Sequence, residues 1–132
     1  MDRTDDAFLK SFENCTLPDS EFDHRGHLRL AWLYLERYSL EEAIERSCDG
    51  ISNYAASLGA SGKFHRTLTE AIVRIMHIRK QAGAEPDFDG FLDKNPDLVE
   101  NMKEVVNSHY SEARLFSNEA RTIFLAPDLQ DF

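Results

Sequence analysis

Several histidines in this sequence are placed against apolar segments. His24 and His27 are three residues apart, so they share one face of a helix and continue its apolar stripe. His65 lies in the first turn of a second apolar segment. Since imidazole titrates near neutral pH and is the commonest protein ligand for metals, these histidines are candidates for catalysis or for metal binding.

A divalent metal such as zinc is one candidate occupant of a site formed by His24, His27 and His65. Three neutral imidazoles with an open fourth position are typical of a catalytic zinc centre. Asp23 and Glu70 are the nearest acidic candidates for the fourth position. Chelating pairs on one helix usually have i, i+4 spacing, whereas His24 and His27 have i, i+3 spacing without an accompanying glutamate. This hypothesis predicts that the three histidines meet in space.

A small anionic molecule is the second candidate. Both histidine motifs lie in the first turns of expected helices, where backbone N–H groups and the helix dipole attract negative charge. The positive side chains of Arg25 and Lys63 flank the two motifs. Thr67 and Thr69 add hydroxyl donors after the second motif, and the Trp32 indole could form an apolar wall of the site. A histidine would then be the general acid or base. The predicted ligand-binding residues are Arg25, Trp32, Lys63, Thr67 and Thr69.

A third hypothesis assigns the chain no site at all. The histidines would then bind backbone carbonyls inside the fold, and the protein would act through its surface as a structural or protein-interaction module. The sequence names no partner for such a module. The three hypotheses remain open at this point.

Composition excludes several classes of partner. The net charge is −9, from 24 acidic and 15 basic residues, and no basic stripe is present, so nucleic-acid binding is not expected. No apolar run approaches the ~20 residues that span a bilayer, so no membrane partner is expected. The first ten residues, MDRTDDAFLK, lack the apolar core of a signal peptide. The expected location is the cytoplasm.

Apolar periodicity predicts the helices that position these residues. Asp23 and Ser39 are expected N-caps, and residues 28–35 are apolar almost all round, which predicts a central helix with Trp32 buried. No segment alternates with the period of a strand. The expected fold is all-α, an irregular compact bundle of five to seven helices in a single domain over residues 1–132. The expected helices cover about 4–14, 24–38, 40–58, 64–81, 87–93, 96–109 and a short segment from 118.

The sequence also resembles a family of small uncharacterised bacterial proteins. The first matching motif is Phe-x-His-x-x-His-Leu-x-x-Ala-Trp, here residues 22–32, and the second is Lys-aromatic-His-x-Thr-x-Thr, here residues 63–69. The third begins at Tyr110-Ser111 and continues through Leu115, Ser117, Ala120 and Arg121. The resemblance covers roughly residues 20–128 and implies no activity. It implies that the characteristic polar residues of the family are the ones that lie on apolar faces here.

Overall fold

The protein is all-α, as the sequence predicts. A computed structural model describes residues 3–132, and within that range it contains α-helices and short 3₁₀ helices but no strand. The chain divides into two compact units, the first ending at Phe64 and the second beginning at His65. Within the described range, none of the helices combines the length and the apolar character needed to cross a membrane.

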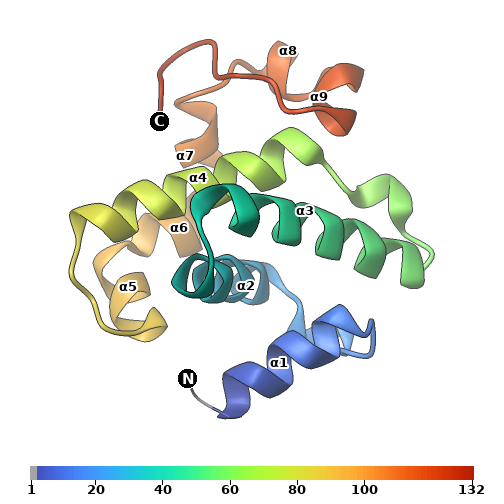
Figure 1. Ribbon diagram of the computed structural model, residues 1–132. Helices are drawn as coiled ribbons and strands as arrows, with labels where there is room; N and C mark the ends of the chain where they lie inside the picture. Colours follow the sequence, from blue (N-terminus) through green and yellow to red (C-terminus); the bar gives the residue numbers. More distant parts are fainter. Residues whose placement is uncertain (1–2) are drawn as a thin grey trace. The chain divides into compact units, whose positions relative to one another are not determined.

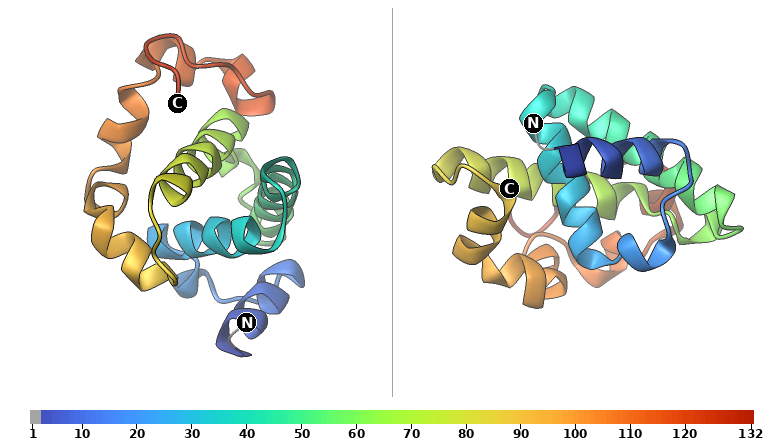
Figure 2. Two further views of the ribbon diagram at one scale, coloured as in Figure 1. Left: turned by 60° about the vertical axis from the view of Figure 1, so that its left-hand side comes forward. Right: turned by 90° about the horizontal axis from the view of Figure 1, so that it is seen from below.

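The first unit is organised around α3, which packs against α2, α1 and η2. Figures 1 and 2 show α2 and α3 side by side, with α1 next to them. Residues 14–23 connect α1 to α2 through η1. The described elements of this unit are α1 (Arg3–Glu13), η1 (Asp19–Glu21), α2 (His24–Arg37), α3 (Leu40–Ser57) and η2 (Ser61–Lys63).

Local signals position α2 and α3 as predicted. The Asp23 carboxylate accepts a hydrogen bond from the Gly26 N–H at 2.9 Å, and the Ser39 hydroxyl accepts one from the Glu42 N–H at 3.3 Å. Both side chains satisfy backbone donors that a helix start leaves unpaired. Trp32 is 4% exposed, so its predicted burial is confirmed.

An aromatic cluster joins α1, α3 and the segment before α2. The Phe12 ring lies 5.0 Å from Phe22 and 5.6 Å from Tyr54, and the rings of Phe22 and Tyr54 are 5.0 Å apart. Gly50 permits this approach, because a Cβ atom there would lie 2.6 Å from the Phe12 ring. The cluster fixes one wall of the candidate site.

The second unit is organised around α4, which packs against α7 and α9. After α4 the chain passes through α5, α6 and α7 and then returns along α8 and α9 (Figure 2). The elements of this unit are α4 (Arg66–Ala82), α5 (Phe88–Lys94), α6 (Pro96–Glu100), α7 (Met102–Asn107), α8 (Glu112–Leu115) and α9 (Asn118–Thr122).

The helix count corrects the expectation of five to seven, because the described residues form nine α-helices. The helix expected over 96–109 is split at Asn101, whose backbone lies outside the helical region at φ −136° and ψ 35°. Asparagine has a lower helix propensity than most of its neighbours here, which favours a break at this position. The segment before α9 also forms a short helix of its own, α8, which Ser111 caps.

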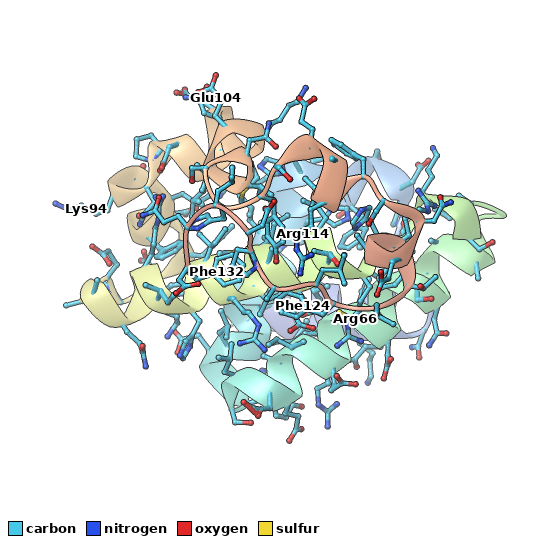
Figure 3. The ribbon with its side chains drawn as sticks, turned by 90° about the horizontal axis from the view of Figure 1, so that it is seen from above. Arg66, Lys94, Glu104, Arg114, Phe124 and Phe132 are labelled. Atoms are coloured by element: carbon cyan, nitrogen blue, oxygen red, sulfur yellow. The ribbon has the colours of Figure 1, made fainter. Side chains whose placement is uncertain are left out.

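The C-terminal segment of the second unit is held by a series of hydrogen bonds. The Tyr110 hydroxyl donates to the Leu125 carbonyl at 2.6 Å, and the Arg114 guanidinium donates to the Ala126 carbonyl at 2.6 Å. The Asp128 carboxylate accepts from both the N–H and the hydroxyl of Ser111, at 2.8 and 2.6 Å. Figure 3 labels Arg114, which donates to this segment, and Phe124, which lies at its start.

Candidate functional site

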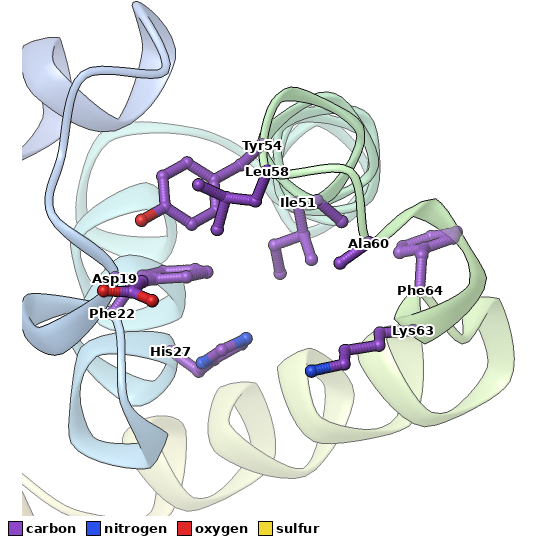
Figure 4. A pocket seen from close by; sticks show the side chains of 10 residues that line it. Asp19, Phe22, His27, Ile51, Tyr54, Leu58, Ala60, Lys63 and Phe64 are labelled. Atoms are coloured by element: carbon purple, nitrogen blue, oxygen red, sulfur yellow. The ribbon is translucent and has the colours of Figure 1, made fainter.

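The first unit contains a cavity of about 250 Å³ bordered by η1, α2, α3 and η2. Figure 4 shows its lining side chains, which are mostly aromatic or aliphatic. Three of them, Asp19, His27 and Lys63, carry polar groups that can be charged. The full lining is Asp19, Phe22, His27, Ile51, Tyr54, Ala55, Leu58, Ala60, Lys63 and Phe64. An apolar cavity with a few polar groups is typical of a small-molecule site.

The start of α2 positions His27 in this cavity. The His27 ring stacks on the Phe22 ring, with centroids 4.0 Å apart and an interplanar angle of 27°. Gly26 lets the preceding turn close tightly, since a Cβ atom there would lie 2.6 Å from the Glu21 carbonyl oxygen. The Asp23 cap and the Gly26 turn therefore present the imidazole next to the aromatic cluster.

The protonation state of His27 follows from its hydrogen bond. Its Nδ1 lies 2.9 Å from the Asp23 carbonyl oxygen, and because a carbonyl only accepts, Nδ1 carries the proton. Burial lowers the pKa of the His27 ring below its ordinary value of 6.5, and the neighbouring His24 adds to this effect. The neutral ring therefore leaves Nε2 as a hydrogen-bond acceptor, and the His27 side chain borders the cavity (Figure 4).

Lys63 supplies positive charge to the same cavity. It ends η2, and no ion pair involves it within residues 3–132, whereas Arg29, Arg37 and Arg46 of this unit all contact carboxylates. In a chain with net charge −9, an unpaired ammonium group beside an apolar cavity is a local attractor for anions. The cavity thus offers a cation, a hydrogen-bond acceptor and an apolar surface.

The other residues predicted in the first unit lie outside this cavity lining. His24 and Arg25 are exposed in the first turn of α2, and Trp32 is buried further along the same helix. The expectation that His24 continues the apolar stripe is therefore wrong, because this side chain is exposed at the helix start. His27 is thus the member of the predicted pair that borders the cavity.

His65 and Thr67 have structural partners inside the second unit. His65 is the N-cap of α4: its Nδ1 accepts from the Leu68 N–H at 3.0 Å, so Nε2 is protonated and donates to the Leu115 carbonyl at 2.8 Å. The buried Thr67 hydroxyl donates to the Ile123 carbonyl and accepts from the Leu125 N–H. His65 of the second motif therefore contacts Leu115 of the third, and Thr67 contacts the segment that follows the third motif. Thr69, a turn onward from His65, is half-buried.

Side chains of the protein itself cap both helix starts at which the sequence predicts an anion site. Asp23 already provides a negative acceptor at the start of α2, and the His65 ring provides an acceptor at the start of α4. Such capping satisfies donors that a bound anion would otherwise use. At the cavity, the positive charge that can attract an anion is that of the Lys63 side chain.

Metal coordination finds no support in the described part of the chain. No group of three or more His, Cys, Asp or Glu side chains within it is arranged to hold a metal ion. His65 uses both ring nitrogens in hydrogen bonds, so it would have to break one of them to become a ligand. The meeting of His24, His27 and His65 at one site stays a prediction.

Sequence reasoning did not identify Asp19, Phe22 or Tyr54 as site residues. Asp19 lies between the first two expected helices, and Tyr54 is a buried residue of α3. Phe22 does belong to the first motif, which was the one available signal.

Comparison with protein-family models, curated proteins and solved structures finds no match to this chain.

Proposed function

We propose that this protein binds a small organic anion, bearing a carboxylate or a phosphate group, in the cavity of its first unit. The anionic group would contact the Lys63 ammonium, and the apolar body would lie against Phe22, Ile51 and Tyr54. The observation that carries the proposal is that Lys63, without an ion-pair partner in the described chain, borders an apolar cavity of about 250 Å³. This volume is near the lower end of known ligand sites, which favours a small ligand.

His27 would give the site its hydrogen-bond specificity. Its neutral ring presents Nε2 as an acceptor, so a ligand with a hydroxyl or amine donor pairs with it and a ligand without one leaves it unpaired. If the protein is an enzyme, the same nitrogen is placed to take a proton from the bound molecule. The stack on Phe22 and the bond to the Asp23 carbonyl hold the ring in position for either role.

Calorimetric titration tests the proposal. Caproate, phenyl phosphate and inorganic phosphate are titrated into the wild type, into Lys63→Gln, and into Lys103→Gln as a control on the exposed surface of α7. We expect an organic anion to bind the wild type and the control alike. Lys63→Gln should weaken this binding about fivefold, the value of a partly exposed ion pair. Undetectable binding of all three probes, or equal weakening in both variants, would overturn the proposal.

The two alternatives have different signatures in the same preparation. A metal site predicts stoichiometric metal in the purified protein and a melting temperature that falls with a chelator, because a bound ion stabilises the folded state by mass action. If the protein is a structural or protein-interaction module, its melting temperature should not change with a chelator or with anions. The proposed site predicts a melting temperature that rises with the organic anion and is indifferent to the chelator.

We also infer that the protein resides in the cytoplasm. Its two cysteines, Cys15 and Cys48, are free thiols, which suits a reducing compartment. Thiol labelling of intact cells and of cell lysates tests this, since a cytoplasmic protein reacts with an impermeant reagent only after lysis. Labelling of Cys15 in intact cells would contradict the location.

A further inference from the structure

The polar groups of the first-unit cavity suggest a more specific ligand than a simple anion. They comprise one cation, Lys63, and two acceptors, the His27 Nε2 atom and the Asp19 carboxylate. We infer that the ligand is a small zwitterion whose carboxylate and ammonium groups are separated by an apolar segment. This inference rests on the proposed binding of an organic anion at Lys63.

Asp19 is the observation that distinguishes a zwitterion from an anion. It is exposed at the start of η1, and within the described residues its carboxylate has no ion-pair partner. Two other acids of this unit are paired with arginines: Asp5 pairs with Arg29 at 2.7 Å, and Glu42 pairs with Arg46 at 2.8 Å. A carboxylate left at the cavity repels a purely anionic ligand and attracts an ammonium group.

The surroundings of Asp19 fit a cation. The Tyr54 hydroxyl donates to the Leu17 carbonyl at 2.7 Å, so this hydroxyl is not the partner of Asp19. Burial raises the pKa of the Tyr54 phenol, and the negative charge of Asp19 raises it further, which reflects the proximity of the carboxylate to this ring. An ammonium group at Asp19 would also face aromatic side chains, which attract cations through their ring faces.

The placement of the charges sets the type of zwitterion. In Figure 4, Asp19 and Lys63 lie on opposite sides of the cavity, and His27 and Ile51 lie between them. An α-amino acid carries both charged groups on one carbon, whereas Asp19 and Lys63 face the cavity from opposite sides. A molecule with an amine and a carboxylate at the two ends of an aliphatic chain can reach both sides while its methylene groups contact Phe22 and Ile51.

The test compares isomeric ligands on the full chain by calorimetric titration. The probes are ε-aminocaproate, its isomer norleucine with both charges on one carbon, and caproate without the amine. We expect ε-aminocaproate to bind the wild type about fivefold more tightly than either of the others, the value of one partly exposed ion pair. The shorter δ-aminovalerate and γ-aminobutyrate then define the length that spans the cavity.

Substitution of Asp19 completes the test. Asp19→Asn should remove the advantage of ε-aminocaproate over caproate without weakening caproate, whereas Asp49→Asn, at an exposed position on α3, should leave the advantage intact. Caproate or norleucine binding as tightly as ε-aminocaproate would refute the zwitterion and leave the anion site standing. An advantage that survives Asp19→Asn would also refute it. Failure of every probe to bind would refute the proposed function itself.

Discussion

Replacing Thr67 with valine tests whether the second sequence motif has a structural role. Valine has nearly the same shape as threonine but lacks the hydroxyl group, and Thr67 is fully buried. Its hydroxyl donates to the Ile123 carbonyl at 2.8 Å and accepts from the Leu125 N–H at 3.1 Å. Two hydrogen bonds at about 0.5–1.5 kcal/mol each give an expected loss of about 2 kcal/mol in the free energy of unfolding.

The matched control for this substitution is Thr69→Val on the same helix. Thr69 is half-buried, and we expect a change within about 0.5 kcal/mol. Urea unfolding followed by circular dichroism gives both free energies, and amide hydrogen exchange shows whether the Leu125 N–H loses protection in Thr67→Val alone. Equal stabilities of the two variants, or unchanged exchange at Leu125, would refute the structural role of Thr67.

Three further predictions concern the core, the site and the C-terminal segment. Trp32→Ala should lower the free energy of unfolding by about 3–5 kcal/mol, because Trp32 is 4% exposed; a loss under about 1 kcal/mol in urea unfolding would contradict its place in the core. Burial lowers the pKa of His27 in the folded protein, so its neutral ring should contribute fully to the free energy of unfolding above pH 6.5. This contribution should be lost as the pH falls through the lowered pKa of the folded state. The same dependence of the free energy of unfolding on pH in His27→Gln as in the wild type would contradict this. Hydrogen bonds from Ser111 lower the pKa of Asp128, so Asp128→Ala should speed amide exchange in residues 123–130, and acidification below the ordinary value of 3.8 should do the same in the wild type. Exchange that is unchanged in this segment would show that other bonds hold it.

Features with local causes could be predicted from the sequence. The Asp23 and Ser39 caps act on backbone groups three residues onward, so a short stretch of sequence contains all that determines them. The burial of Trp32 follows from apolar neighbours on nearly every side of one helix. The all-α fold follows from several such periodic segments.

Features that depend on distant partners could not be predicted. Thr67 binds a backbone segment 56 to 58 residues later, and His65 binds the Leu115 carbonyl 50 residues later. From the sequence alone, a histidine and a threonine at these positions suggested a binding site, whereas the structure shows internal hydrogen bonds. Histidine is an unusual N-cap, so the sequence did not identify His65 as the cap of α4. The helix therefore begins at Arg66, two residues after the expected start at Phe64.

The cavity depends on four elements that are separate in the sequence. His27 and Lys63 were both identified from the sequence, since an imidazole on an apolar face and a lysine in an acidic chain are visible there. Asp19 was not, because its significance comes from its position across the cavity from Lys63. The type of a residue is visible in a sequence, whereas its position opposite another residue requires the fold.

The most direct test of the anion site is a nuclear magnetic resonance map of ligand binding. Caproate and ε-aminocaproate are titrated into isotope-labelled protein while the backbone amides and the His27 ring are observed. The account predicts shifts concentrated at Phe22, His27, Tyr54 and Lys63, and their loss in Lys63→Gln. Shifts that map to the second unit, or that persist unchanged in Lys63→Gln, would contradict it.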